Sequence, residues 1–251
     1  MKKLKSIITK YVSLLTILSI ISIWFIISYL ELVPRFMLPS PTDVLLAFIE
    51  DFRLIFNHIS ITLFEAIIGL VISVIFSFVL AIIMDRYDIF NKAIYPILII
   101  SQTVPTIAIA PIIVLWFGFG IMPKILLIFS TCFFPMTISI LTGFKNIDKD
   151  MLKLMKSMNS SYLKTLFIVK IPMSMKSFFS GLKISSTYAI VGAVVSEWLG
   201  GEKGIGVYMT RVKKGYSFDK MFASIIVISL LSLLLVQFIK FLEKKIIYWK
   251  E

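Results

Sequence analysis

The chain has 251 residues, 59% of them hydrophobic, and a mean hydropathy of +0.97. One core of this size cannot bury so many apolar side chains, so the composition excludes an ordinary soluble domain. The formal net charge is +12. We attribute it to membrane topology and to attraction toward anionic lipid headgroups, because no basic groove with interleaved aromatic residues indicates nucleic-acid binding.

Six apolar stretches are each long enough to cross a bilayer, since a core of about 30 Å requires about 20 helical residues. They lie at residues 12–30, 59–84, 93–117, 125–143, 178–199 and 221–242. Their continuous apolar character favours helices over a barrel, because every backbone N–H in lipid must be satisfied within its own segment. The sequence therefore predicts an all-α polytopic membrane protein with about six transmembrane helices.

The first stretch follows Lys2, Lys3 and Lys5, as a signal peptide would. However, it extends to about residue 30 and is followed by charged and bulky residues rather than by a small-residue cleavage site. We expect a retained helix. The predicted organisation is an N-terminal helix with an external linker (1–58), a core of about five transmembrane helices (59–245) and a cytoplasmic tail (246–251).

The distribution of Lys and Arg predicts the orientation in the membrane. With both termini in the cytoplasm, 17 basic residues fall on the inner side and 8 on the outer side. We therefore expect both chain ends to be cytoplasmic.

The second stretch carries a weakly polar face that recurs every four residues. Its members are Glu65, Gly69, Ser73, Ser77 and Ala81. Glu65 and Glu197 are the two carboxylates inside predicted membrane helices, where ionisable groups face protein or water rather than lipid. Both are candidates for a solute pathway, and a structural pairing near the outer end is an equally open alternative.

The third stretch contains Pro105 and Pro111, which interrupt the helical hydrogen-bond ladder. Kinking for packing is the default interpretation. Because Gln102 and Thr103 lie beside them, freed carbonyls and polar side chains could also contact solute. These four residues are further pathway candidates.

A basic insert at 146–176 separates the fourth and fifth stretches. Asp148 is a predicted N-cap, and the apolar residues that follow recur at helical spacing. These are Met151, Leu154, Met155 and Met158. Asn159 tolerates a left-handed turn, a serine can cap a second helix near Tyr162, and Pro172 is expected to end that helix. Such a helix–turn–helix could receive force from a partner protein and pass it to the next membrane helix. The alternative is a helix that lies on lipid headgroups.

Small residues form a stripe along the fifth stretch, at Ser185, Ala189, Gly192 and Ser196. Such stripes allow close helix packing, which is the favoured interpretation. A second interpretation places the stripe at a dimer interface that lines a passage.

Motifs of soluble enzymes do not occur in the sequence. There is no Walker loop, no G-x-S-x-G and no H-E-x-x-H, so we expect no enzymatic activity and no nucleotide bound by this chain. One cysteine, Cys132, and one histidine, His58, without a carboxylate cluster predict no metal site.

The insert from Lys153 to Pro172 resembles the cytoplasmic coupling loop of binding-protein-dependent ABC importer permeases. That pattern reads Glu-Ala-Ala, three residues, Gly, nine residues, Ile-x-Leu-Pro. Here Asn159 stands at the glycine, Val169 and Ile171 at the aliphatic positions, and Pro172 matches. The Glu-Ala-Ala element is replaced by Lys-Leu-Met at 153–155.

Three further segments resemble permeases of the nitrate, sulfonate, taurine and thiamine-precursor group. They are Leu-Pro-Ser-Pro-Thr-Asp-Val at 38–44, the proline-containing third stretch at 104–120, and Gly-Ala-Val-Val-Ser-Glu-Trp-Leu-Gly at 192–200 followed by Gly-Ile-Gly at 204–206. Within this group, the chain is most similar to the thiamine-pyrimidine-precursor branch, at Glu65-Ala66, Trp116-Phe-Gly118 and Glu197-Trp198.

This resemblance implies the type I ABC importer permease fold in a bacterial cell membrane. It implies a second permease copy, two separate ATP-binding subunits beneath the coupling loops, and an external solute-binding protein. ATP would be used by the partner subunits, and the solute would be a thiamine-precursor pyrimidine. Sulfonate, taurine, nitrate or riboflavin are alternative solutes. A self-contained secondary transporter or channel is less favoured, because mid-membrane coupling carboxylates are few.

Overall fold

The computed structural model describes residues 2–247, and within them the side chains of residues 11, 12 and 14–247. All regular secondary structure in this described part is helical, which confirms the predicted all-α class. The described residues form two compact units, 2–57 with 208–227, and 58–207 with 228–247. Of the predicted tail at 246–251, residues 248–251 lie outside the described part.

The first unit contains helices α1 (Lys2–Tyr29) and α2 (Pro41–Glu50). Trp24 Nε1 donates a hydrogen bond to the Pro39 carbonyl at 3.0 Å, which ties the end of α1 to the linker. Ser40 caps α2, because its hydroxyl accepts from Asp43 N while the Asp43 carboxylate accepts from Ser40 N. The local sequence Ser-Pro-Thr-Asp is thus sufficient to start α2 where it does.

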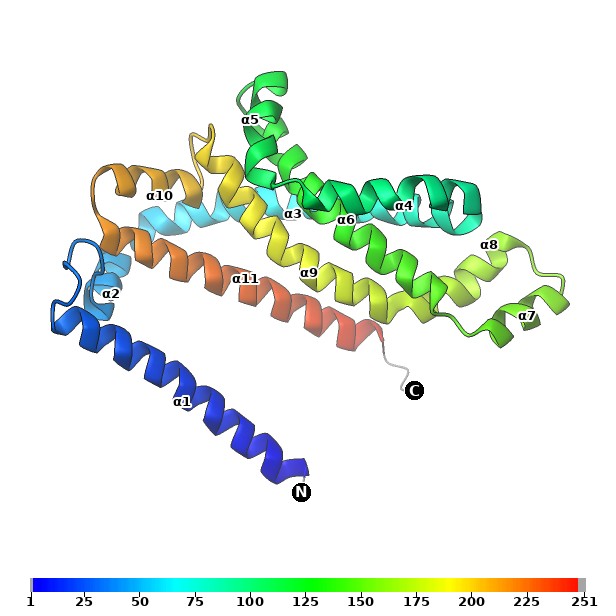
Figure 1. The fold of residues 1–251 in the computed structure, drawn as a ribbon, viewed down its shortest axis with the longest axis horizontal. Helices are drawn as coiled ribbons and strands as arrows, with labels where there is room; N and C mark the ends of the chain where they lie inside the picture. Colours follow the sequence, from blue (N-terminus) through cyan, green and yellow to red (C-terminus); the bar gives the residue numbers. More distant parts are fainter. Residues whose placement is uncertain (1, 248–251) are drawn as a thin grey trace. The chain divides into compact units, whose positions relative to one another are not determined.

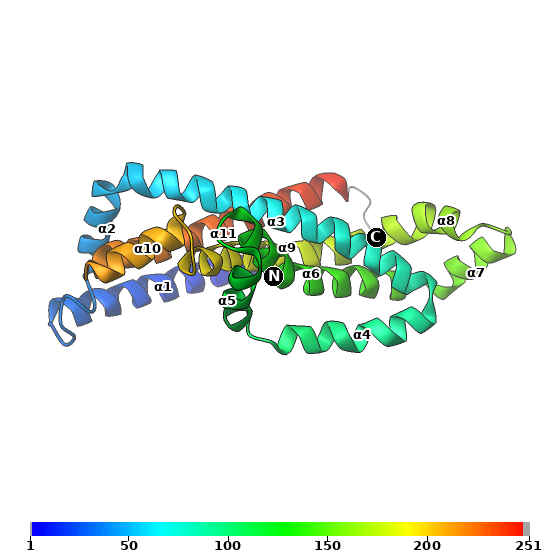
Figure 2. The same cartoon turned by 90° about the horizontal axis from the view of Figure 1, so that it is seen from above.

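The second unit is built on three long helices, α3 (Phe52–Arg86), α6 (Ile121–Lys145) and α9 (Ile171–Trp198). Helices α6 and α9 lie side by side along most of their length (Figure 1). Helix α4 (Asp88–Thr103) runs beside α6, and α5 (Thr106–Phe117) packs against α6 and α9 (Figure 2). The last two helices in the chain are α10 (Ile205–Lys214) and α11 (Phe218–Ile246).

Four helical segments in the described part are long and apolar enough to cross a membrane: Phe52–Arg86, Ile121–Lys145, Tyr162–Trp198 and Phe218–Ile246. Helices α4 and α5 qualify together as a fifth span that bends by 99°. Leu14–Tyr29 is an apolar helical segment below this length. The third predicted stretch is therefore not one continuous helix, because Pro105 lacks an N–H and holds Val104 extended at ψ 121°.

Small residues on α3 and α9 allow both helices to approach α6 closely. Ser77 Oγ on α3 donates to the Phe133 carbonyl at 2.8 Å. On the other side, Ser185 Oγ donates to the Cys132 carbonyl and Cys132 Sγ to the Ser185 carbonyl, both at 3.2 Å. The two stripes read from the sequence are therefore packing surfaces against one shared helix.

The predicted coupling insert forms α7 (Lys149–Ser157), α8 (Tyr162–Thr165) and a π-helical turn, η1 (Leu166–Lys170). Helices α7 and α8 project beyond the ends of α6 and α9 at one end of the unit (Figure 1). Residues 162–198 run as one helical segment through η1 into α9. The insert thus continues directly into a membrane-spanning helix.

Candidate functional site

The turn between α7 and α8 adopts the geometry that the sequence predicts. Asp148 Oδ1 accepts a hydrogen bond from Asp150 N at 2.8 Å and so caps α7. Asn159 has φ +50°, the left-handed conformation that ends the helix. Ser161 then caps α8, since its hydroxyl accepts from Lys164 N.

Of the four apolar residues that the sequence singled out in and just after α7, one packs and three are exposed. Met155 is only 9% exposed and lies in a small cluster with Ile147 and Val169. Met151, Leu154 and Met158 remain 41%, 55% and 68% exposed. We call these three residues the α7 apolar face, and it is available to a partner.

An ion pair anchors the coupling insert at 146–176, which we call the coupling segment, to the end of α3. Lys170 Nζ lies 2.6 Å from Asp85 Oδ2, and the Tyr162 hydroxyl donates to the same oxygen at 2.9 Å. The guanidinium of Arg86 lies 4.8 Å from the centre of the Tyr162 ring, within cation–π distance. Asp85 was not among the predicted coupling residues, although an acidic residue at the inner end of a predicted span was a usable signal.

Pro172 does not end the second helix of the insert, contrary to the sequence prediction. It stands in the first turn of α9, where the proline's missing N–H costs least. The wider turn of η1 immediately precedes it, and such a turn accommodates the disrupted hydrogen-bond ladder. Helix α9 therefore continues the direction of the coupling segment.

A buried ion pair lies at the predicted outer end of the unit. Lys124 Nζ on α6 is 2.6 Å from Glu65 Oε1 on α3, and the two side chains are 10% and 5% exposed. Lys124 was not among the predicted site residues, and its pairing with Glu65 was not predicted. Of the two roles considered for Glu65, a solute pathway or a structural pairing, the structure contains the pairing.

Three side chains hold the backbone that begins α10. Gly204 N donates to His58 Nδ1 at 3.0 Å, Ile205 N to Thr62 Oγ1 at 2.9 Å, and Gly206 N to Glu197 Oε2 at 2.6 Å. These are the helix N–H groups that have no partner within their own helix. Thr62 Oγ1 also donates to Glu197 Oε1 at 2.6 Å. Glu197 therefore has a structural role in this conformation.

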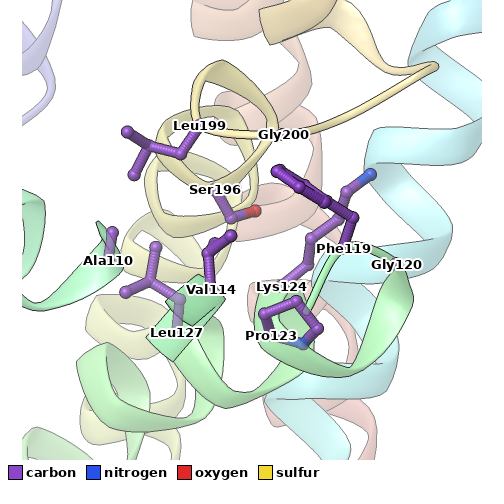
Figure 3. A pocket seen from close by; sticks show the side chains of 10 residues that line it. All are labelled: Ala110, Val114, Phe119, Gly120, Pro123, Lys124, Leu127, Ser196, Leu199 and Gly200. Atoms are coloured by element: carbon purple, nitrogen blue, oxygen red, sulfur yellow. The ribbon is translucent and has the colours of Figure 1, made fainter. Parts of the chain in front are cut away.

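Ser196 lies beside a small hollow at the same end (Figure 3). Apolar side chains, among them Val114, Leu127 and Leu199, surround it, and the Ser196 hydroxyl donates to the Ala193 carbonyl at 2.7 Å. The hollow has a volume of about 10 Å³, room for about one water molecule. It does not admit a solute in this conformation.

The break between α4 and α5 opens a larger pocket of about 260 Å³. Gln102 and Pro105, two of the predicted pathway residues, line it together with residues of α6 and with Tyr188 of α9. Thr103 is not among the lining residues, and its hydroxyl donates to the Ile100 carbonyl at 2.7 Å. Pro111 lies inside α5, which continues through it. Ser185, Ala189 and Gly192 pack against α6 and do not line the pocket.

Comparison with known proteins identifies the family. Residues 73–248 match the model of the binding-protein-dependent transport system inner membrane component. The chain belongs to this family. It is the membrane-spanning permease subunit of an ABC importer, a transport protein rather than an enzyme, and its expected partners are ATP-binding and solute-binding proteins.

The relatives differ in the solutes for which they are named. The permease is 34% identical over 217 residues to a formylaminopyrimidine transport permease protein, ThiX, of Halalkalibacterium halodurans, covering 86% of this chain and 87% of that protein. It is 28% identical over 233 residues to a putative aliphatic sulfonates transport permease protein, SsuC, of Bacillus subtilis, covering 92% and 84%.

A solved structure supports the fold of the permease. The MetNI methionine ABC transporter in an inward-facing conformation matches with a TM-score of 0.63 at 14% identity, covering 78% of this chain and 95% of that one. This likeness confirms the predicted type I permease fold.

Proposed function

We propose that this permease imports a small pyrimidine precursor of thiamine, as a homodimer whose coupling segments each receive a separate ATPase subunit. The termini lie in the cytoplasm and the apolar outer surfaces of the spans face lipid. ATP is bound and hydrolysed by the partner subunits. Closure of these subunits pushes the coupling segment, and the push passes through η1 into α9, so that the passage opens alternately to either side.

The exposed α7 apolar face is the observation that carries this proposal. Three large apolar side chains stand in the open at the tip of a segment that is otherwise held firmly to α3 by Asp85. An exposed apolar patch next to a rigid anchor is suited to receive a partner and to transmit its movement. If α7 instead lay on lipid headgroups, its exposed apolar face would be explained, but the Asp85–Lys170 ion pair would have no role.

The choice of solute is supported by relatedness. The relative named for formylaminopyrimidine is more similar to this chain than the one named for aliphatic sulfonates, at 34% against 28% identity. A sulfonate remains the alternative solute on the strength of the second relative.

Co-purification with the ATPase tests the docking role of α7. We expect Leu154→Ser and Met158→Ser each to weaken ATPase binding by about tenfold or more, because each removes one apolar side chain worth about 1.5–3 kcal/mol when buried. Lys156→Ser, an exposed residue of the same helix, is the matched control. The measurement is the affinity of the ATPase for purified permease in detergent, together with pyrimidine uptake into proteoliposomes.

Retention of the ATPase by both apolar variants would refute the docking role. If the same variants instead lost affinity for ATPase-free lipid vesicles, α7 would be an interfacial helix.

A further inference from the structure

The pocket at the α4–α5 break lies in the middle of a bent membrane span. Helix α4 ends at Thr103 and α5 begins at Thr106, with the 99° bend between them. Irregular backbone at membrane depth is tolerated where it faces protein or a water-filled cavity, and not where it faces lipid. The position of the break therefore assigns this pocket to the protein interior or to an aqueous passage.

Two prolines that line the pocket remove N–H donors from the backbone beside it. Pro105 and Pro135 both line it, and neither has an N–H. The carbonyls of Ser101 and Thr131, four residues earlier, consequently cannot receive the usual helical hydrogen bond from these positions. Both of these residues also line the pocket.

The side chains around the pocket are polar or aromatic but uncharged. Ser130 and Thr131 donate their hydroxyl hydrogens to their own helix, at 2.8 Å to the Leu127 and Ile128 carbonyls, so their oxygens are left to accept. Gln102 is an exposed residue that lines the pocket, and Phe134 and Tyr188 supply aromatic surface. No Lys, Arg, Asp or Glu lines this pocket in the described part of the chain.

We infer that this pocket binds the solute during its passage and selects a neutral, amino-bearing heteroaromatic ring over an anion. This inference rests on the proposed import function and adds the site and the chemical basis of its selectivity. An exocyclic amino group donates to the freed carbonyls and hydroxyl oxygens, and the ring stacks on aromatic surface. A sulfonate finds no cation there, and burying its charge unpaired is costly. The volume of about 260 Å³ lies just below the range of about 300–1,000 Å³ typical of pockets for drug-sized ligands, which suits a single ring.

Equilibrium binding to the permease–ATPase complex in nanodiscs, without the solute-binding protein, tests this site. The probes are a radiolabelled 4-aminopyrimidine and unlabelled methanesulfonate as competitor. We expect saturable binding of the pyrimidine, no competition by methanesulfonate, and about three- to tenfold weaker binding for Gln102→Leu and Thr131→Val, as expected for one lost hydrogen bond.

The controls separate a lost contact from a lost fold. Thr187→Val changes an exposed threonine next to Tyr188 but outside the pocket and should bind like the wild type. Thr131→Ser keeps the hydroxyl and should restore binding. Co-purification of the ATPase reports assembly of every variant.

Two results would overturn the inference in different ways. Equal pyrimidine binding by Gln102→Leu, Thr131→Val and Thr187→Val, while the complete system with its binding protein still takes up pyrimidine, would refute the site and leave the import function intact. Methanesulfonate binding and uptake in place of pyrimidine by the wild type would refute both the pocket's selectivity and the proposed solute.

Discussion

At the scale of single residues, burial separates two ion pairs of the permease that have the same chemistry. The Glu65–Lys124 pair is almost fully buried, whereas the Asp88–Lys92 pair of similar length is 73% and 77% exposed. Removing one partner of a buried pair leaves an unpaired charge, which costs far more than the loss of a solvated pair. Loss of one partner should therefore destabilise the fold at the Glu65–Lys124 pair and have little effect at the Asp88–Lys92 pair.

We expect Lys124→Met to lower the free energy of unfolding by about 3–5 kcal/mol, because Glu65 would be left buried without its partner. The double variant Glu65→Gln with Lys124→Met should recover most of this loss. Lys92→Met, at the exposed pair, should leave the free energy of unfolding nearly unchanged, because both groups stay solvated. Thermal unfolding of the purified permease in detergent measures all three, and equal losses for the two lysine variants would contradict the burial argument.

At the scale of elements, short sequence motifs start helices while contacts between helices hold them. The capping box of α2 is joined by Arg35, whose Nε and Nη2 both donate to the Asp43 carboxylate, at 3.0 and 2.7 Å. This bidentate hydrogen bonding is the main reason that the pKa of Asp43 is lowered from 3.8 to about 2. The start of α2 is thereby linked to the protonation of one carboxyl group.

This shift predicts how the start of α2 responds to acid. Because the pKa of Asp43 is lower in the folded state, its ionisation stabilises the fold fully above about pH 4, and this stabilisation disappears as the pH falls through about 2. Amide hydrogen exchange of α2 should therefore stay unchanged from pH 7 to 4, after correction for intrinsic rates, and accelerate below it. Asp43→Asn should lack this step, and a step persisting in that variant would assign it to another group.

At the scale of the whole molecule, the proposed function requires a rigid connection between the coupling segment and the membrane helices. Asp85 receives both Lys170 and Tyr162, and all three groups are partly or fully shielded from solvent. The α7 apolar face stands apart from this anchor. The proposed mechanism thus assigns partner binding and the transmission of its movement to different residues.

Asp85→Asn should separate these two roles. The amide can still accept from Tyr162, but it no longer neutralises Lys170, so the anchor weakens while the exposed face of α7 is unchanged. We expect normal co-purification of the ATPase with solute uptake reduced several-fold per ATP hydrolysed. Asp88→Asn, three residues away in an exposed pair, is the control. Loss of ATPase binding in the Asp85 variant would show that the anchor shapes the docking surface itself.

The sequence by itself determined what depends on local chemistry. Apolar length predicted most of the spans, Asp148 and a serine at 160 or 161 predicted helix starts, and Asn159 predicted the left-handed turn, because each rests on a few neighbouring residues. The resemblance of the coupling loop placed the chain in its family.

Only the tertiary structure decided which distant groups meet. Glu65 and Lys124 are 59 positions apart, and Thr62 and Glu197 are 135 apart, so no local pattern could pair them. The two small-residue stripes gave no sign that both would pack on α6, and Pro172 gave no sign that a π-helical turn would carry the coupling segment into α9. Such outcomes depend on how long helices pack against one another, and that packing is a property of the folded chain as a whole.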